Sequence, residues 1–260
     1  MRSYYFCLLL LYTIFPAPVL AQSPQSRTYA SQNVRTHVLE LFSSEGCSSC
    51  PPAESWLTEL RKEKNLWKTF VPLQFHVDYW DNLGWPDHYA TKDYTKRQTD
   101  YAREWGTGNV YTPEFVLDGK EWQNRSISIL NAPAEEIVGR LFVEQIQNYR
   151  FMLKFSPLPQ VGSDYLAHCS LLGNNLQTQV LRGENGGANL THDFIVLAMK
   201  RILMRRQSKP FENTFVANID FSDVRESTSF FPNIAQKSIV CWASTTTSLR
   251  PLQAVGGDLP

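Results

Sequence analysis

Residues 43–52, SSEGCSSCPP, constrain the fold most strongly, because two cysteines stand between a strand pattern and a helix pattern. The run at 34–42, VRTHVLELF, is apolar and β-branched, as in a buried strand. The segment at 53–64, AESWLTELRKEK, has the apolar spacing of an amphipathic helix. Pro51 and Pro52 fit the first turn of that helix, where a missing N–H costs little. Cys47 and Cys50 are therefore predicted at the start of a helix that directly follows a strand.

The pattern continues as an alternation of strands and helices. FVPLQFHVDYW at 70–80 predicts a second strand, 93–105 a polar helix ending at Gly106, and EFVLDGKEW at 114–122 a hairpin that turns at Asp118 and Gly119. PAEEIVGRLFVEQIQNY at 133–149 predicts a further amphipathic helix. This order predicts an α/β fold with parallel strands, and the short strand-like runs after residue 151 predict a smaller, mostly β unit.

The first residues have the layout of a secretory signal peptide. Arg2 is followed by an apolar stretch at 4–15, and a small-residue cleavage site ends at Ala21. The stretch is too short to span a bilayer, which needs about 20 apolar residues. We therefore expect a signal peptide at 1–21, a flexible lead-in at 22–32, a first domain at 33–150 and a β-rich domain at 151–260. The mature protein is expected to be secreted or periplasmic, with no stable membrane insertion.

The charge balance argues against a nucleic-acid partner. The chain has 25 Lys and Arg against 25 Asp and Glu, so no global field would attract a polyanion. No sequence pattern implies an organic cofactor either. The cysteines are the remaining source of chemistry.

The cysteine pair predicts thiol–disulfide chemistry. A helix N-terminus, with its unpaired N–H groups and dipole, favours the thiolate of Cys47, and Cys50 lies close enough to form a disulfide with it. Cys47 is expected to attack a protein or small-molecule disulfide, and Cys50 to resolve the mixed disulfide. Two alternatives stay open: a copper or zinc carrier using Cys47, Cys50 and His76, and a redox-silent binding module with a static disulfide. Structural zinc sites usually need a second cysteine pair, and the chain has no second CxxC.

Polar and aromatic residues gather after the second predicted strand, in HVDYWDNLGWPDHY at 76–89. Ligands of open α/β sheets bind beyond the carboxyl ends of such strands. The competing interpretation is a turn in which Asp78 and Asp81 cap backbone groups. The candidate substrate-contacting or proton-transfer neighbours of the thiols are Glu45, His76, Asp78, Trp80 and Asp81, with Asp78 and Trp80 preferred. For GENGGANLTHD at 183–193, a connecting turn is favoured over a ligand-binding loop.

Cys169 and Cys241 form a second candidate pair. Each lies in a strand-like run, and alternation places each on the apolar face of its strand. If the two strands are neighbours, an oxidising compartment favours a structural disulfide between them. Two separate buried thiols are the alternative.

Four motifs occurring in order carry a family resemblance: LFSSEGCSSCPPA, HVDYWDNLGWPD, VYTPEFVLDG and GENGGANLTHDFIV. Over residues 36–200 the chain resembles the secreted bacterial family known as domain of unknown function 1223, within the thioredoxin-like superfamily. The resemblance implies a thioredoxin-like fold for residues 33–150 and export, without a substrate. It also implies that Cys47 and Cys50 are the family's thiol pair. Thr112 and Pro113 would then form a cis-proline loop that faces the pair and shapes a substrate groove, and the alternative is a proline that begins an edge strand.

Overall fold

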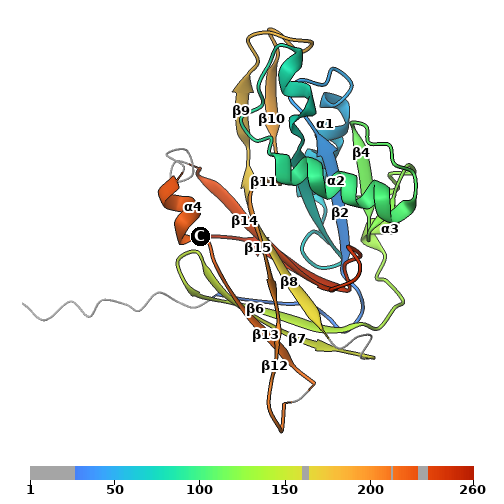
Figure 1. The fold of residues 1–260 in the computed structure, drawn as a ribbon, viewed down its shortest axis with the longest axis vertical. Helices are drawn as coiled ribbons and strands as arrows, with labels where there is room; N and C mark the ends of the chain where they lie inside the picture. Colours follow the sequence, from blue (N-terminus) through green and yellow to red (C-terminus); the bar gives the residue numbers. More distant parts are fainter. Residues whose placement is uncertain (1–26, 160–163, 212, 228–233) are drawn as a thin grey trace, which may run out of the picture.

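The computed structural model describes residues 27–159, 164–211, 213–227 and 234–260 (Figure 1). The predicted signal peptide lies outside the described residues. Strands make up 43% of the structure and helices 18%. The strands form sheets of eight, five and two strands. Within the described ranges, no helix is long and apolar enough to cross a membrane.

The eight-stranded sheet is mixed and forms the centre of the molecule. Its strand order is β15-β14-β8-β11-β3-β2-β4-β5. β2 pairs with β3 in parallel and with β4 antiparallel, and β11 joins the parallel part through Ile195 opposite Gln74. The strands are β2 (His37–Ser43), β3 (Phe70–His76), β4 (Glu114–Leu117), β5 (Lys120–Glu121), β8 (Tyr165–Asn174), β11 (Ile195–Leu203), β14 (Gln236–Thr245) and β15 (Gln253–Asp258).

The other two sheets are antiparallel. The five-stranded sheet has the order β1-β6-β7-β13-β12, and β9 pairs with β10 as a separate hairpin. These strands are β1 (Thr28–Ala30), β6 (Gly139–Gln147), β7 (Arg150–Pro157), β9 (Leu176–Gln179), β10 (Asn189–His192), β12 (Arg205–Arg206) and β13 (Phe215–Asp220).

The helices are short, and three of them gather around β2 and β4 in the upper half of Figure 1. The α-helices are α1 (Pro51–Glu59), α2 (Lys92–Trp105), α3 (Ile127–Asn131) and α4 (Ser222–Ser227), and the 3-10 helices are η1 (Leu60–Lys62) and η2 (Asp78–Leu83). The strand at 34–42, the helix at 53–64, the strand at 70–80, the helix at 93–105 and the hairpin at 114–122 were all predicted. These elements are confirmed within a few residues at their ends.

The predicted fold class is nevertheless wrong. The protein is not a thioredoxin-like α/β domain followed by a smaller β domain, because it is mostly β and has three sheets. The eight-stranded sheet does not end at the strands of the first half: β8, β11, β14 and β15 extend it. One sheet thus contains strands from both sides of residue 150.

The expected helix at 133–149 is instead mostly strand β6. Its apolar residues fit both helical and alternating spacing, and Leu141 and Val143, two positions apart, are both buried. β6 pairs with β7 along most of its length and with β1 on its other edge. Backbone pairing on both edges and burial of the alternating face therefore outweighed the helical spacing.

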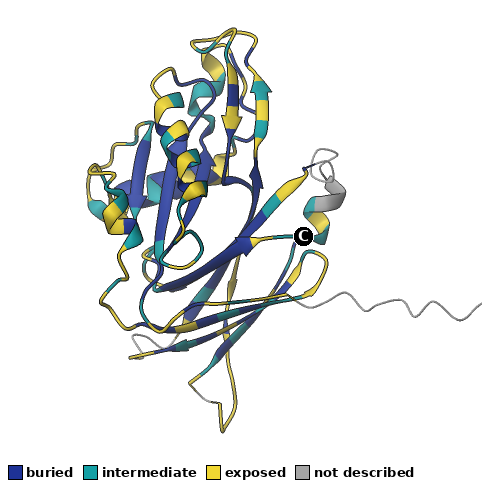
Figure 2. Ribbon diagram, turned by 180° about the vertical axis from the view of Figure 1, so that it is seen from behind, coloured by how far each residue is buried: buried dark blue, intermediate teal, exposed yellow. Residues whose placement is uncertain are grey.

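Two apolar cores lie on opposite faces of the eight-stranded sheet, as the alternation along β14 demonstrates. Val240 and Trp242 belong to the core beneath the helices, whereas Ile239 and Cys241 belong to the core between the large sheet and the five-stranded sheet. Figure 2 shows that the central strands are buried along most of their length. Because both faces are covered, β2 and β3 can be apolar on both sides, which explains their nearly continuous apolar sequences.

The second cysteine pair is a disulfide, as predicted. Cys169 in β8 and Cys241 in β14 are directly opposite each other in the antiparallel register, with their Cα atoms 4.1 Å apart. Both are buried in the core between the two large sheets. The disulfide therefore links two adjacent strands of the eight-stranded sheet covalently.

Candidate functional site

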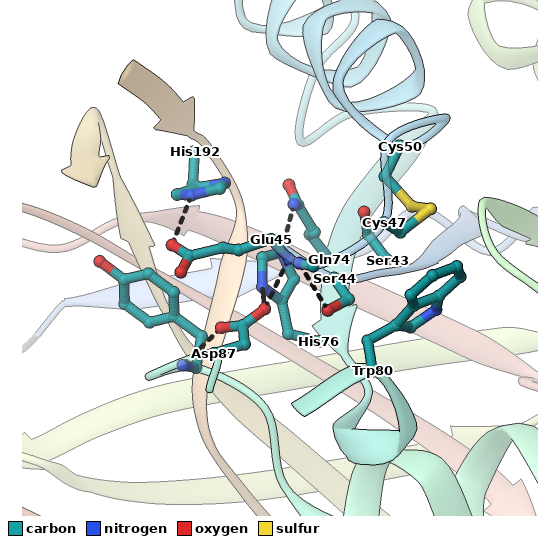
Figure 3. Close-up of polar contacts among 12 residues, drawn as sticks. Ser43, Ser44, Glu45, Cys47, Cys50, Gln74, His76, Trp80, Asp87 and His192 are labelled. Atoms are coloured by element: carbon teal, nitrogen blue, oxygen red, sulfur yellow. Dashed lines mark hydrogen bonds and ion pairs between the residues drawn. A yellow bond between two sulfur atoms is a disulfide. The ribbon is translucent and has the colours of Figure 1, made fainter. Parts of the chain in front are cut away.

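Cys47 and Cys50 form a disulfide at the start of α1, with their Cα atoms 5.4 Å apart. β2 ends at Ser43, and a short turn in which the Cys47 N–H donates to the Ser44 carbonyl leads into the pair (Figure 3). Cys50 is the N-cap residue of α1, and its carbonyl oxygen accepts the N–H groups of Ala53 and Glu54. The predicted placement at a strand–helix junction is therefore confirmed.

The first turn of α1 offers Cys47 fewer N–H groups than predicted. The prediction invoked unpaired N–H groups in the first helical turn, but Pro51 and Pro52 have no N–H to offer. The next two N–H groups, of Ala53 and Glu54, are bonded to the carbonyl oxygen of Cys50. The helix dipole is left as the feature of α1 that favours a thiolate at this position.

The loop containing Thr112 and Pro113 lies against Cys47. The Thr112–Pro113 peptide bond is cis, the isomer that the resemblance implied, and the Thr112 carbonyl oxygen is 3.8 Å from Cys47 Sγ. The indole Nε1–H of Trp80 donates to Thr112 Oγ1 at 2.8 Å. Trp80, one of the two preferred candidate neighbours of the thiols, thus holds this loop beside the disulfide by a hydrogen bond.

The loop at 181–188, which joins β9 to β10, closes over the cysteine turn. Asn185 Nδ2 donates to the carbonyl oxygens of Glu45 and Cys47 at 2.9 and 3.0 Å, and Glu184 Oε2 accepts the N–H of Ser48 at 3.1 Å. Both cysteines are 0% exposed. The first part of GENGGANLTHD, at 183–188, is therefore a connecting turn that also holds the cysteine turn in place, whereas Asn189–His192 form strand β10.

The hairpin that carries this loop packs on the segment after η2. Val180 and Leu190 form a small apolar cluster with Trp85. Gly183, with φ of +80°, comes so close to Trp85 that a Cβ atom added there would lie 3.3 Å from the Trp85 Cβ. A glycine suits this position because its φ is unfavourable for other residues.

A buried cluster of histidines and carboxylates lies to one side of the disulfide, and Figure 3 labels His76, His192, Glu45 and Asp87 of this cluster. His192 Nδ1 is 2.8 Å from Glu54 Oε2, and His192 Nε2 is 3.1 Å from Glu45 Oε1. His76 Nδ1 is 2.6 Å from Asp87 Oδ2, and its Nε2 is 3.6 Å from Glu54 Oε1. Glu54 is one helical turn after Cys50, so α1 connects the cluster to the disulfide.

Burial shifts the pKa of each of these groups towards its neutral form, but the neighbouring opposite charges shift it further towards the charged form. Burial raises the pKa of Glu54, yet His192 and His76 lower it to about 2. Burial likewise raises the pKa of Asp87, and His76 lowers it to about 2. Burial lowers the pKa of both histidines, but Glu54 and Glu45 raise that of His192 to about 10, and Asp87 raises that of His76 above its ordinary value. His192 is therefore protonated at neutral pH when no other cation balances the carboxylates, and the raised pKa of His76 favours its protonated form.

A family model described as a protein of unknown function (DUF1223) matches residues 38–230. The chain belongs to the DUF1223 family. No curated protein matches this DUF1223 chain.

Two solved structures resemble this DUF1223 protein. A crystal structure of an Agrobacterium tumefaciens protein has a TM-score of 0.60 at 19% identity, covering 88% of this chain and 96% of that chain. HBP35 of Porphyromonas gingivalis has a TM-score of 0.55 at 16% identity, covering 88% of this chain and 76% of that chain. At these identities the likeness concerns the fold alone.

The residues predicted as neighbours of Cys47 and Cys50 separate into two groups. Glu45 and His76 join the buried cluster, and Trp80 contacts the Thr112 loop. Asp78 instead pairs with Thr95 of α2, and Asp81 accepts the N–H of Asp87. The turn-capping interpretation thus describes Asp81, whose carboxylate accepts a backbone N–H, whereas the carboxylate of Asp78 accepts the Thr95 hydroxyl.

Sequence reasoning did not select Glu54, Asp87 or His192 as site residues. Glu54 carried a signal, because it lies between apolar positions on the buried face of the 53–64 helix pattern. Asp87 lies in the polar segment that was singled out, but no spacing rule distinguished it from its neighbours. His192 is 138 residues from Glu54 and reaches it only through the β9–β10 hairpin, so no local pattern could have found this pair.

The metal alternative based on Cys47, Cys50 and His76 stays a prediction, because the two sulfurs are bonded to each other in this structure. His76 Nδ1 faces Asp87, and its Nε2 faces the amide of Gln74. Within the part of the chain that the structure describes, the group with metal-ligand spacing comprises Glu54, His76 and His192. It contains no cysteine.

Proposed function

We propose that this protein carries out thiol–disulfide exchange through Cys47 and Cys50. The observation that carries the proposal is the position of the Cys47–Cys50 disulfide at the N-terminus of α1, with Cys47 Sγ beside the Thr112 carbonyl. A helix N-terminus favours the thiolate that exchange requires. The substrate class is a protein or small-molecule thiol or disulfide.

The exchange begins from the oxidised pair as follows. A substrate thiolate attacks Cys47 Sγ, a mixed disulfide forms, and Cys50 leaves as a thiolate. A second substrate thiolate then attacks the substrate sulfur of the mixed disulfide and releases Cys47. The substrate dithiol loses two electrons and becomes a disulfide, while the protein disulfide gains them and becomes a dithiol. The reverse sequence reduces a substrate disulfide, with Cys47 attacking and Cys50 resolving.

Access to Cys47 is the structural requirement of this proposal. Cys47 Sγ is buried, so the incoming sulfur needs a local opening of the cysteine turn. The 181–188 loop is the element to move, because Asn185 and Glu184 hold the turn through three hydrogen bonds. Ser48 and Ser49, between the two cysteines, are already exposed.

The test compares Cys50→Ser with Cys47→Ser, each with the Cys169–Cys241 bond intact. Each variant is incubated with oxidised glutathione, quenched with acid and mapped by mass spectrometry. We expect a glutathione adduct on Cys47 of the Cys50→Ser variant, forming at least tenfold faster than any adduct on Cys50 of the Cys47→Ser variant. Equal rates would remove the assigned roles, and the absence of an adduct on either folded variant would refute the exchange activity.

A further inference from the structure

We propose that Glu54, His76 and His192 form a buried binding site for a divalent transition-metal cation of the Zn²⁺ class. The three side chains come from α1, β3 and β10, and one potential ligand atom of each lies within 4.8 Å of the others. All three are buried. Two imidazoles and one carboxylate are a donor set that zinc and related cations prefer.

The distances agree with such a site. A tetrahedral zinc ion with bonds of about 2.0–2.1 Å holds its ligand atoms about 3.3 Å apart. Glu54 Oε2 is 2.8 Å from His192 Nδ1, and Glu54 Oε1 is 3.6 Å from His76 Nε2. These separations, which involve the two different oxygens of Glu54, bracket the tetrahedral value, and the three ligand atoms lie within 4.8 Å of one another. Binding a cation would therefore need the side chains to draw closer together.

The carboxylates at the outer ring nitrogens of the two histidines also support a metal site. A histidine that binds a metal through one ring nitrogen usually donates its other N–H to a carboxylate or carbonyl. His76 Nδ1 faces Asp87 at 2.6 Å, and His192 Nε2 faces Glu45 at 3.1 Å, so both histidines have this partner on the side away from Glu54.

The two outer carboxylates are themselves fixed. Glu45 Oε2 accepts the indole N–H of Trp85 at 2.7 Å. Asp87 accepts the backbone N–H groups of Glu45 and Tyr89, each at 2.8 Å. The orientation of both imidazoles is therefore set before any cation binds, as in preorganised metal sites.

Gln74 supplies a candidate fourth donor. It is fully buried, its Nε2 lies 2.7 Å from His76 Nε2, and its Oε1 has no hydrogen-bond partner. Turning the amide by 180° exchanges its oxygen and nitrogen, which places the oxygen beside His76 Nε2, the atom proposed to bind the cation. In that orientation the oxygen can bind a cation, or accept the His76 N–H when no cation is present.

The charge count also admits a divalent cation. Glu45, Glu54 and Asp87 bring three carboxylates into a buried space that contains two imidazoles. Carboxylates in such a place need positive charge close by. A divalent cation with two neutral imidazoles supplies the same charge as two imidazolium groups. The competing state is therefore the metal-free ion-pair network, and experiment distinguishes the two.

The test uses the full chain with both disulfides closed, so that no thiol can bind the probe. The protein is stripped with a chelator and titrated with Zn²⁺, and retained zinc is measured by elemental mass spectrometry after gel filtration. We expect one zinc per chain. Glu54→Gln and His192→Gln should each weaken the affinity at least tenfold, whereas His88→Gln, at an exposed histidine, should leave it unchanged. Retention of less than a tenth of an equivalent by folded wild-type protein would overturn the proposal, as would binding that neither ligand variant weakens.

A second measurement covers the case in which a buried variant fails to fold. X-ray absorption of zinc-loaded wild-type protein should give a first shell of nitrogen and oxygen with imidazole scattering and no sulfur. A sulfur-containing shell, or a shell without imidazole, would overturn the assignment. The glutathione exchange of Cys47 is measured on separate variants, so either proposal can fail while the other stands.

Discussion

Asn185→Ala is predicted to speed the reduction of the Cys47–Cys50 disulfide. The substitution removes two hydrogen bonds that tie the 181–188 loop to the carbonyl oxygens of Glu45 and Cys47. A hydrogen bond between neutral groups contributes about 0.5–1.5 kcal/mol net, so the loss of two amounts to about 1–2 kcal/mol after some replacement by water. That energy raises the population of the open loop about 5- to 30-fold, because about 1.4 kcal/mol corresponds to a factor of ten.

The assay is the rate of disulfide reduction by dithiothreitol in native buffer, followed by alkylation and mass spectrometry. If reduction proceeds through the open loop, the rate should rise by the same 5- to 30-fold. Asn148→Ala is the matched control, because Asn148 is exposed and lies in a different turn, between β6 and β7. A rate for Asn185→Ala within twofold of wild type, with global stability unchanged, would refute the idea that this loop limits access to Cys47.

Three further predictions concern stability, each measured by urea unfolding. The double variant Cys169→Ala with Cys241→Ala should lower the free energy of unfolding by about 4 kcal/mol, the loop-entropy value for a sequence separation of 72. A loss below about 1 kcal/mol would contradict a stabilising role of this disulfide. Glu40→Gln should cost about 3–5 kcal/mol, because Arg97 keeps a buried charge without its partner, and Glu40→Leu with Arg97→Met should recover most of that loss. Burial holds the pKa of His168 well below its ordinary value of 6.5, and two nearby arginines lower it further. The unfolded state therefore binds the proton first, so the free energy of unfolding falls as pH drops below about 6.5. His168→Phe should make the free energy of unfolding less dependent on pH below 6.5, and an unchanged dependence would contradict this account.

Local sequence was sufficient for the elements around the disulfide. The apolar β2, the prolines after Cys50 and the Asp118–Gly119 turn each leave few structural options, and all three predictions held. In these segments the pattern of burial, the backbone restrictions of proline and the turn preference agree with one another. Agreement between independent local signals is what makes a segment predictable.

The fold class failed because it depends on which strands become neighbours across long sequence separations. Pairing of β11 with β3, through Ile195 and Gln74, joins the β-rich second half to the first-half sheet, and no local pattern encodes that contact. The 133–149 segment failed for a related reason. Its apolar spacing suited two periods, and the partner strands β7 and β1 decided between them.

The site was predicted in part for the same reasons. Cys47, Cys50 and Thr112 lie in motifs whose spacing is visible in the sequence. The buried cluster draws on Glu54, Asp87 and His192 from separate elements, and their proximity depends on the β9–β10 hairpin reaching over α1. A charged residue on an otherwise apolar helix face, as at Glu54, is the signal that could have directed attention there.

The central claim is that Cys47 and Cys50 exchange disulfides while the protein stays folded. The most direct measurement equilibrates the wild-type protein in glutathione buffers of graded potential, quantifies both disulfides by alkylation and mass spectrometry, and records near-ultraviolet circular dichroism of each sample. The account predicts a reversible two-electron transition of the Cys47–Cys50 pair, with the Cys169–Cys241 bond intact and the tertiary spectrum retained. A Cys47–Cys50 bond that stays closed across the whole glutathione range, or that opens only as the protein unfolds, would contradict it.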